Sequence, residues 1–182
     1  MPTANDVIEF WQKSGPERWF AKDEAFDAEI RARFEGLHHQ AACGELTDWS
    51  GTWQGSLALL LLLDQFPRNL YRSSGHAFAT DRLALSLARA ALAAGQDQAA
   101  PAELRVFFYL PFEHSEALVD QDRCVELCEA LDARSGSDWA RWARQHRDVI
   151  ARFGRFPHRN AALGRETSAE EQAFLDSGGF SG

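Results

Sequence analysis

The side chain best suited to acid–base chemistry is His114, which lies between Glu113 and Glu116 shortly after a proline and a run of aromatic residues. An imidazole titrates near neutral pH, and a neighbouring carboxylate such as Glu116 can orient it as a general acid or base. The alternative is that Ser115 and Glu116 are the ordinary first residues of a helix. The segment supports both interpretations, and its His-x-Glu spacing is not a metal-binding signature.

A second candidate is the carboxylate of Asp64, which follows a run of leucines. Asp64 shares a helix face with Leu57 and Leu60, so we expect it to point inward, where a carboxylate needs a partner. The C-terminal end of a helix also disfavours an acid, by roughly 0.3–1 kcal/mol. Such a conflict with the rules of folding points to function. The alternative is a structural ion pair with Arg68 or Arg72.

The third segment is basic in a chain that is otherwise acidic. Residues 149–165 contain four arginines and His158 but no acid. Guanidinium groups suit carboxylates and phosphates, and turns at glycine and proline expose backbone N–H groups. These arginines either pair internally with Asp64, Glu113 and Glu116 or bind an external anion. The expected ligand-binding residues are Arg68, Arg155, His158, Arg159 and Asn160.

The composition limits the classes of partner. The chain has 182 residues and a net charge of -8, which argues against nucleic acid and against an anionic membrane surface. Its three cysteines are too few for a disulfide framework and indicate a reducing compartment. Cys124 and Cys128 are interpreted as small buried residues rather than half of a metal site. We therefore expect neither a metal nor another cofactor.

The chain also shows no targeting or membrane segment. The first ten residues carry Asp6 and Glu9 but no basic region, so they do not form a signal peptide. The most apolar run, residues 57–63, is far shorter than the roughly twenty residues needed to cross a bilayer. These features predict a soluble, cytoplasmic protein.

The elements that position the three segments are predicted to be helices throughout. Apolar residues recur at helical spacing, most clearly between Asp23 and Cys43, where His38 and His39 are expected to be solvated or to be favoured by the helix dipole. The helix at 51–65 is apolar on nearly every side, so it is expected to be central and to end at Pro67. The eight expected helices are about 3–13, 23–43, 51–65, 76–94, 101–111, 115–133, 138–153 and 168–176.

The spacing of turns between these helices is typical of antiparallel helix pairs stacked side by side. We expect one helical domain over residues 1–176 and a flexible C-terminal tail over 177–182. No repeat of fixed period is visible. One short segment is nearly repeated, because Phe66-Pro67-Arg68-Asn69 is similar to Phe156-Pro157-His158-Arg159-Asn160.

Three segments together resemble the hallmark motifs of a bacterial family, the domain-of-unknown-function family 924. They are residues 63–69 (LDQFPRN), 111–116 (PFEHSE) and 153–160 (FGRFPHRN). The resemblance covers nearly the whole chain and implies a tetratricopeptide-like fold, an irregular solenoid of about eight helices. Glu113 stands where the family commonly has an apolar residue, which weakens it as a site residue. The family has no established activity, so the resemblance implies no mechanism.

Three functions remain open. The first is a binding domain for a small anionic ligand or an acidic peptide, with its groove lined by Asp64, Arg68, His114, Glu116, Arg155, His158 and Arg159. The second is a hydrolase or transferase with His114 as general acid–base, oriented by Glu116 or Asp64. The third is a protein-interaction module in which the motifs only lock helices together. The first two require that the three segments meet at one place open to solvent.

Overall fold

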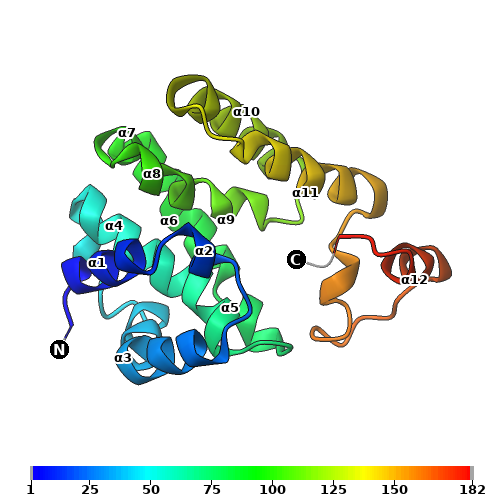
Figure 1. Cartoon of the computed structure of the whole chain (residues 1–182), viewed down its shortest axis with the longest axis horizontal. Helices are drawn as coiled ribbons and strands as arrows, with labels where there is room; N and C mark the ends of the chain where they lie inside the picture. The colour runs from blue at the N-terminus through cyan, green and yellow to red at the C-terminus, as the bar shows by residue number, and fades with distance from the viewer. Residues whose placement is uncertain (1, 181–182) are drawn as a thin grey trace. The chain divides into compact units, whose positions relative to one another are not determined.

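The computed structural model describes residues 2–180, and every regular element among them is a helix or helical turn (Figure 1). The predicted all-α fold is confirmed. The chain divides into two compact units. Unit 1 comprises the residues up to Arg72 together with 76–111, and unit 2 comprises 73–75 together with the residues from Phe112 onward. The stacking of helix pairs and the single domain over 1–176 stay predictions.

Unit 1 contains most of the helices. Its α-helices are α1 (Ala4–Ser14), α2 (Pro16–Trp19), α3 (Glu24–Ala42), α4 (Trp53–Leu60), α5 (Phe66–Leu70), α6 (Asp81–Ala93), α7 (Gln96–Ala99) and α8 (Ala102–Arg105). Tighter 3₁₀ turns are η1 (Thr47–Gly51), η3 (Gly75–Phe78) and η4 (Val106–Phe108), and η2 (Leu61–Gln65) is a wider π turn. Helix α9 (Leu110–Glu113) spans the boundary between the units.

The continuous segment α4–η2–α5 is the centre of unit 1. It contacts α1, α3 and α6, which confirms the central position expected from its leucines. Gly55 allows the close packing of its first turn, because a Cβ atom there would lie 1.8 Å from the carbonyl oxygen of Trp49. The apolar stripe of α3 is buried as predicted. In α6, however, the small residues Ala84, Ala88 and Ala91 face inward, while Leu83 is exposed.

The prediction that Pro67 ends the central helix is wrong. Pro67 instead occupies the first turn of α5, where its missing N–H costs no hydrogen bond within that helix. The helical path therefore continues to Leu70. The irregularity that proline introduces is absorbed one turn earlier, in η2.

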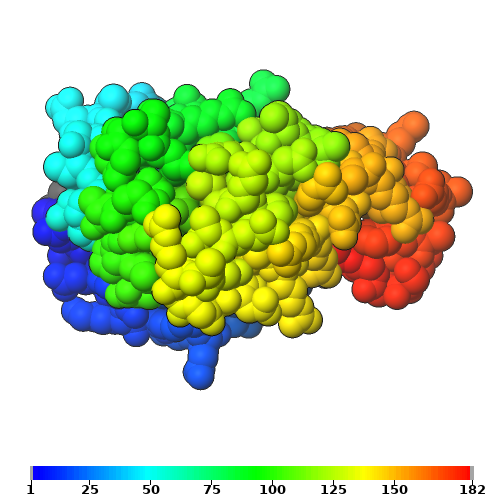
Figure 2. Space-filling model, turned by 90° about the horizontal axis from the view of Figure 1, so that it is seen from above, coloured from blue at the N-terminus to red at the C-terminus, as the bar shows by residue number. Residues whose placement is uncertain are grey.

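Unit 2 is built on a helical hairpin. Helices α10 (Leu118–Ser135) and α11 (Trp139–Phe153) run side by side, and Figure 2 shows them as adjoining ridges. Asp132 of α10 accepts hydrogen bonds from the first N–H groups of α11, at 3.0 Å from Trp139 and 2.8 Å from Ala140. The turn η5 (Pro157–Arg159) and helix α12 (Ala169–Asp176) follow. Helix α12 packs beside the end of α11.

Candidate functional site

The first motif contains a π turn that follows from the chemistry of Pro67. In a regular α-helix the N–H of residue 67 would bond to the carbonyl of Leu63, but proline has no N–H and its ring clashes with that carbonyl. The chain widens by one residue, so that the N–H of Phe66 bonds to the carbonyl of Leu61. Turns of this kind are frequent at functional sites. The role of this π turn therefore depends on which groups bind its displaced carbonyls.

Side chains satisfy the displaced carbonyls. The oxygen of Leu62 accepts from His38 Nδ1 (2.8 Å), that of Leu63 from Thr80 Oγ1 (2.5 Å) and that of Asp64 from the Arg68 guanidinium. The prediction that His38 is solvated is therefore wrong, because its ring is buried against the turn. Burial lowers the pKa of His38, which keeps the ring neutral with its proton on Nδ1. His39 is exposed, as expected.

The carboxylate of Asp64 is enclosed and paired. The residue is 1% exposed, its Oδ1 lies 3.5 Å from Arg68 Nη1, and its Oδ2 accepts a 2.5 Å hydrogen bond from Gln65. Arg68 also binds both oxygens of Asp81, at 3.1 and 3.2 Å. These contacts fit the structural ion pair considered as the alternative. Arg72 takes no part in it, because it pairs with Asp27.

A shallow hollow of about 500 Å³ lies on unit 1 between α3 and α5. Asp27 and Arg72 are among the residues that border it, but Asp64 and Arg68 are not. The Asp27 carboxylate accepts hydrogen bonds from Arg72 and, at 2.8 Å, from Asn69. Asp27 and Arg72 are thus paired with each other, and the hollow holds none of the expected site residues.

In unit 2, Glu116 joins the second motif to the third. Its carboxylate accepts two hydrogen bonds from Arg165, at 2.7 and 3.0 Å, and one of 2.8 Å from the N–H of Phe156. Burial alone raises the pKa of Glu116, but these hydrogen bonds outweigh it and lower the pKa overall. Helix α10 begins only at Leu118, so Ser115 and Glu116 precede the helix rather than form its first turn.

Arg155 and Asn160 belong to a second ion-paired group. Arg155 binds Glu171 of α12 through two hydrogen bonds of 2.6 and 2.8 Å, and this contact, with the N–H of Ser168, lowers the pKa of Glu171 to about 2. Asn160 is fully buried, donates to Glu171 at 3.4 Å and accepts from Arg165 at 2.9 Å. These residues fix the η5 turn between α11 and α12.

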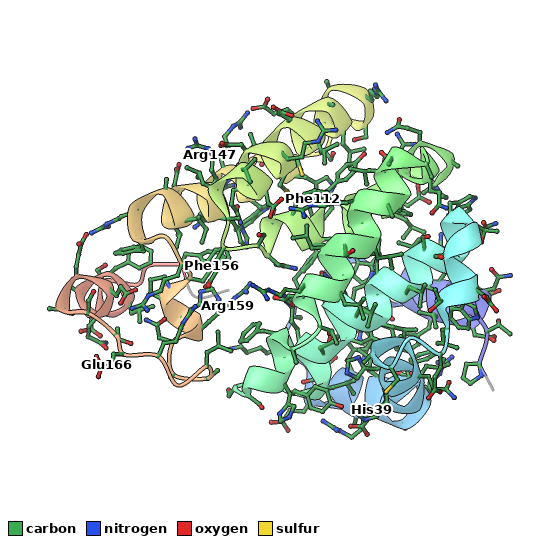
Figure 3. The ribbon with its side chains drawn as sticks, turned by 180° about the vertical axis from the view of Figure 1, so that it is seen from behind. His39, Phe112, Arg147, Phe156, Arg159 and Glu166 are labelled. Carbon is green, nitrogen blue, oxygen red and sulfur yellow. The ribbon has the colours of Figure 1, made fainter. Side chains whose placement is uncertain are left out.

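The remaining polar residues of the motifs gather around an aromatic ring. We call this group the imidazole cluster, and it consists of His114, His146, His158, Arg159, Phe156 and Phe180. The rings of His146 and His158 lie 5.8 and 5.5 Å from the buried ring of Phe156. The Arg159 guanidinium stacks on the same ring at 4.5 Å, and Figure 3 shows Phe156 and Arg159 next to each other.

His114 and Arg159 complete the imidazole cluster on the side of the second motif. The ring of His114 lies 6.4 Å from that of His146, centroid to centroid. Arg159 Nη1 donates a 3.1 Å hydrogen bond to the backbone carbonyl of His114, which ties the η5 turn to the second motif. The two segments that carry His114 and Arg159 are therefore side by side, as the sequence predicted for the second and third motifs.

Three of the groups that lower the pKa of His146 are nitrogen groups of the same cluster. Burial, followed by the charges of His114, Arg159 and His158, lowers the pKa of His146 from 6.5 to about 3. The hydrogen bond from its Nδ1 to the carbonyl of Trp142, 2.9 Å long, acts in the opposite direction but is weaker. Four cationic or titratable nitrogen groups thus share one partly enclosed region, which favours an anion.

Glu113 lies at the edge of the imidazole cluster. Its Oε1 is 3.4 Å from His146 Nδ1, and because His146 is neutral at pH 7 this contact is polar rather than an ion pair. On its other side Glu113 meets the Cys124 thiol, 3.9 Å away, and Cys124 lies 3.9 Å from Cys128. Both cysteines are buried, and the contact with the Cys128 thiol, followed by burial, raises the pKa of Cys124.

The structure thus sorts the expected site residues into three places. His114, His158 and Arg159 meet in the imidazole cluster. Glu116, Arg155 and Asn160 form the neighbouring ion-paired network. Asp64 and Arg68 belong to unit 1, and their meeting with the others stays a prediction, as does catalysis by His114.

Three members of the imidazole cluster, His146, Phe156 and Phe180, are not among the expected site residues. The signal that the sequence offers for His146 is its helical spacing with the apolar residues Trp142 and Val149 of α11. Phe180 falls in the predicted flexible tail, of which residues 181 and 182 lie outside the described part of the chain. No spacing in the sequence links Phe180 to the histidines.

Residues 2–180 lack two further features. No group of three or more His, Cys, Asp or Glu side chains in this range is placed to hold a metal ion. Nor does any helix in the same range combine the length and apolarity that a membrane crossing requires.

Comparison with known proteins identifies the family. The model of the family described as bacterial protein of unknown function (DUF924) matches residues 7–179. The chain is similar to a solved structure, the protein of unknown function ATU0120 from Agrobacterium tumefaciens, with 48% identity over 96% of this chain and 97% of that one and a TM-score of 0.90. No curated protein matches the chain. The resemblance seen in the three motifs is therefore confirmed, and the chain belongs to the DUF924 family of bacterial proteins.

Proposed function

We propose that unit 2 binds a small anionic ligand at the imidazole cluster. The observation that carries the proposal is the gathering of His146, His158 and the Arg159 guanidinium around Phe156, with the imidazole of His114 next to that of His146. Burial, and then the charges of the neighbouring groups, lower the pKa of His146. Imidazole N–H and guanidinium groups are donors that suit a carboxylate or a phosphate. An anion that entered the cluster would pair with the Arg159 guanidinium and accept hydrogen bonds from imidazole N–H groups.

This proposal narrows the set of binding residues. In this proposal Arg159 and His158 bind the ligand, and His114 and His146 lie beside them. Arg155 and Asn160 are assigned a supporting role, because their hydrogen bonds to Glu171 hold the η5 turn in place.

Isothermal titration with inorganic phosphate and with acetate, in a buffer low in chloride, tests the proposal. We expect Arg159→Ala to weaken binding at least about tenfold, because a hydrogen bond to a charged group contributes roughly 1.5–3 kcal/mol. Arg141→Ala is the matched control, since Arg141 is an exposed arginine on α11. Arg159→Lys keeps the charge and should recover part of the affinity.

Two results would show that the proposal is wrong. One is a wild-type protein that binds neither anion. The other is a folded Arg159→Ala variant, as judged by its circular dichroism and melting temperature, that binds both anions as well as the wild type does.

A structural role for the rest of the motifs is supported by a separate observation. The guanidiniums of Arg68, Arg155 and Arg165 each bind a carboxylate through two hydrogen bonds, to Asp81, Glu171 and Glu116 respectively. This is the arrangement expected if these residues lock helices together, as in a protein-interaction module. Arg155→Ala should then lower the melting temperature and change phosphate affinity less than about twofold. If Arg155→Ala folds but no longer binds phosphate, Arg155 is instead part of the binding site.

A further inference from the structure

The ring of Phe180 occupies the imidazole cluster although it comes from the end of the chain. Its centroid lies 4.3 Å from the ring of His146, 5.4 Å from that of His158 and 6.2 Å from that of Phe156. Phe180 is only partly buried. The space that its ring fills therefore has aromatic walls and reaches the surface.

Phe180 is attached to α12 through two glycines. The N–H of Gly179 donates a 2.9 Å hydrogen bond to the carbonyl of Phe174, and a Cβ atom at Gly179 would lie 2.5 Å from that oxygen. Only glycine allows this approach. The backbone at Gly179 thus sets the position of Phe180, and a change there would displace the ring without altering it.

The walls around Phe180 combine flat rings with cationic groups. The rings of His146 and His158 bound the space, and Arg159 stacks on the far wall, Phe156. Aromatic pairs of this kind stabilise one another beyond the effect of the area they bury. A group that replaced the ring of Phe180 would keep those contacts, and a carboxylate attached to it would reach the imidazole and guanidinium donors.

We propose that the ligand of the imidazole cluster is a small aromatic carboxylate, and that Phe180 is an intramolecular competitor for the place of its ring. This inference rests on the proposed anion site and adds the class of ligand and the means by which its binding is restrained. The apparent affinity for the ligand is proportional to the fraction of molecules in which the ring of Phe180 has left the site.

Titration calorimetry with three probes tests the inference: 3-phenylpropionate, its neutral amide and acetate. Removal of the competitor in Phe180→Ala should raise the affinity for 3-phenylpropionate about tenfold and that for acetate less than about twofold. Gly179→Ala, which retains the ring but displaces it, should change affinity in the same direction. Phe20→Ala is the control, because Phe20 is an exposed phenylalanine of unit 1. The amide should bind at least about tenfold more weakly than the acid.

The possible outcomes separate this inference from the proposed function. If both variants bind 3-phenylpropionate less tightly than the wild type, Phe180 is part of the binding surface and the competitor is ruled out. If acetate binds in an Arg159-dependent way but 3-phenylpropionate binds no tighter in any variant, the ligand class is wrong while the anion site stands. If neither acid binds any variant, both proposals are overturned.

Discussion

The two units use nearly the same short sequence, Phe66–Asn69 in unit 1 and Phe156–Asn160 in unit 2. In both copies the phenylalanine is fully buried and the proline begins a helical turn. In both, the arginine donates to a backbone carbonyl of another segment or turn, and the asparagine amide binds a carboxylate. In both units the repeated segment therefore connects one turn to neighbouring segments through hydrogen bonds.

What differs is the set of side chains around each copy. In unit 1, Arg68 also binds the carboxylate of Asp81 and lies beside that of Asp64. In unit 2, Arg159 stacks on Phe156 among imidazoles, one of them supplied by the extra residue His158. The same turn thus serves as an ion-paired joint in one unit and as the support of a cationic cluster in the other. The surrounding helices, rather than the motif, decide which.

The largest effect is expected from Asp64→Ala, which breaks the joint in unit 1. The change removes a buried carboxylate that lies beside Arg68 and accepts from Gln65, while Asp81 still pairs with Arg68, and the loss of such a buried partner costs about 3 kcal/mol. Urea denaturation should show this loss of unfolding free energy, while Asp48→Ala, at an exposed position of the same unit, should change it by less than about 0.5 kcal/mol. A loss below about 1 kcal/mol for Asp64→Ala would show that the joint is not structural.

Lowering the pH should reduce the free energy of unfolding through His146 of unit 2. The folded-state pKa of His146 is about 3, below the ordinary value of 6.5, so its contribution to stability is present above pH 6.5 and is lost as the pH falls toward 3. Between pH 7 and pH 4 this amounts to about 3 kcal/mol. Urea denaturation at both pH values should show a loss that is smaller by this amount in His146→Gln.

The control for the acid experiment is His39→Gln, because His39 is exposed. This variant should lose as much stability as the wild type does between the two pH values. An identical loss in wild type and His146→Gln would mean that His146 is protonated as easily in the folded state as in the unfolded one.

A smaller effect is expected where Thr80 supports the π turn. Thr80→Val removes the hydrogen bond to the carbonyl of Leu63 and should cost about 1–2 kcal/mol. In a Pro67→Ala background residue 67 regains its N–H, so the same change should cost less. A double-mutant cycle measures the coupling. If Thr80→Val costs the same unfolding free energy in both backgrounds, the hydrogen bond of Thr80 does not compensate for the missing N–H of Pro67.

Local sequence patterns were enough to predict most of the fold. The apolar stripe of α3 depends on neighbours three or four residues away, and its residues are buried as expected. The π turn was not predicted, because its stability depends on His38 and Thr80, which are distant in sequence. The same reason explains why His38 was assigned to solvent.

The candidate site was predicted only in part, again because of long-range contacts. The residue types in the motifs indicated that His114, His158 and Arg159 could act together, and the structure brings these three into one cluster. The carboxylate that Arg155 binds comes from Glu171, which lies outside every motif. Whether a guanidinium is available to a ligand depends on such a partner. The spacing of residues within a motif does not show which distant carboxylate will be that partner.

The distribution of histidines between the units gives the most direct test of the comparison. Three of the six are in unit 1 (His38, His39 and His76) and three are in unit 2 (His114, His146 and His158). Long-range ¹H–¹⁵N spectra of the imidazole rings can be recorded during titration with inorganic phosphate at constant pH. We expect the resonances of the unit 2 histidines to shift and saturate together while those of unit 1 stay in place. Equal shifts in all six rings, or shifts confined to unit 1, would contradict an anion site at the imidazole cluster.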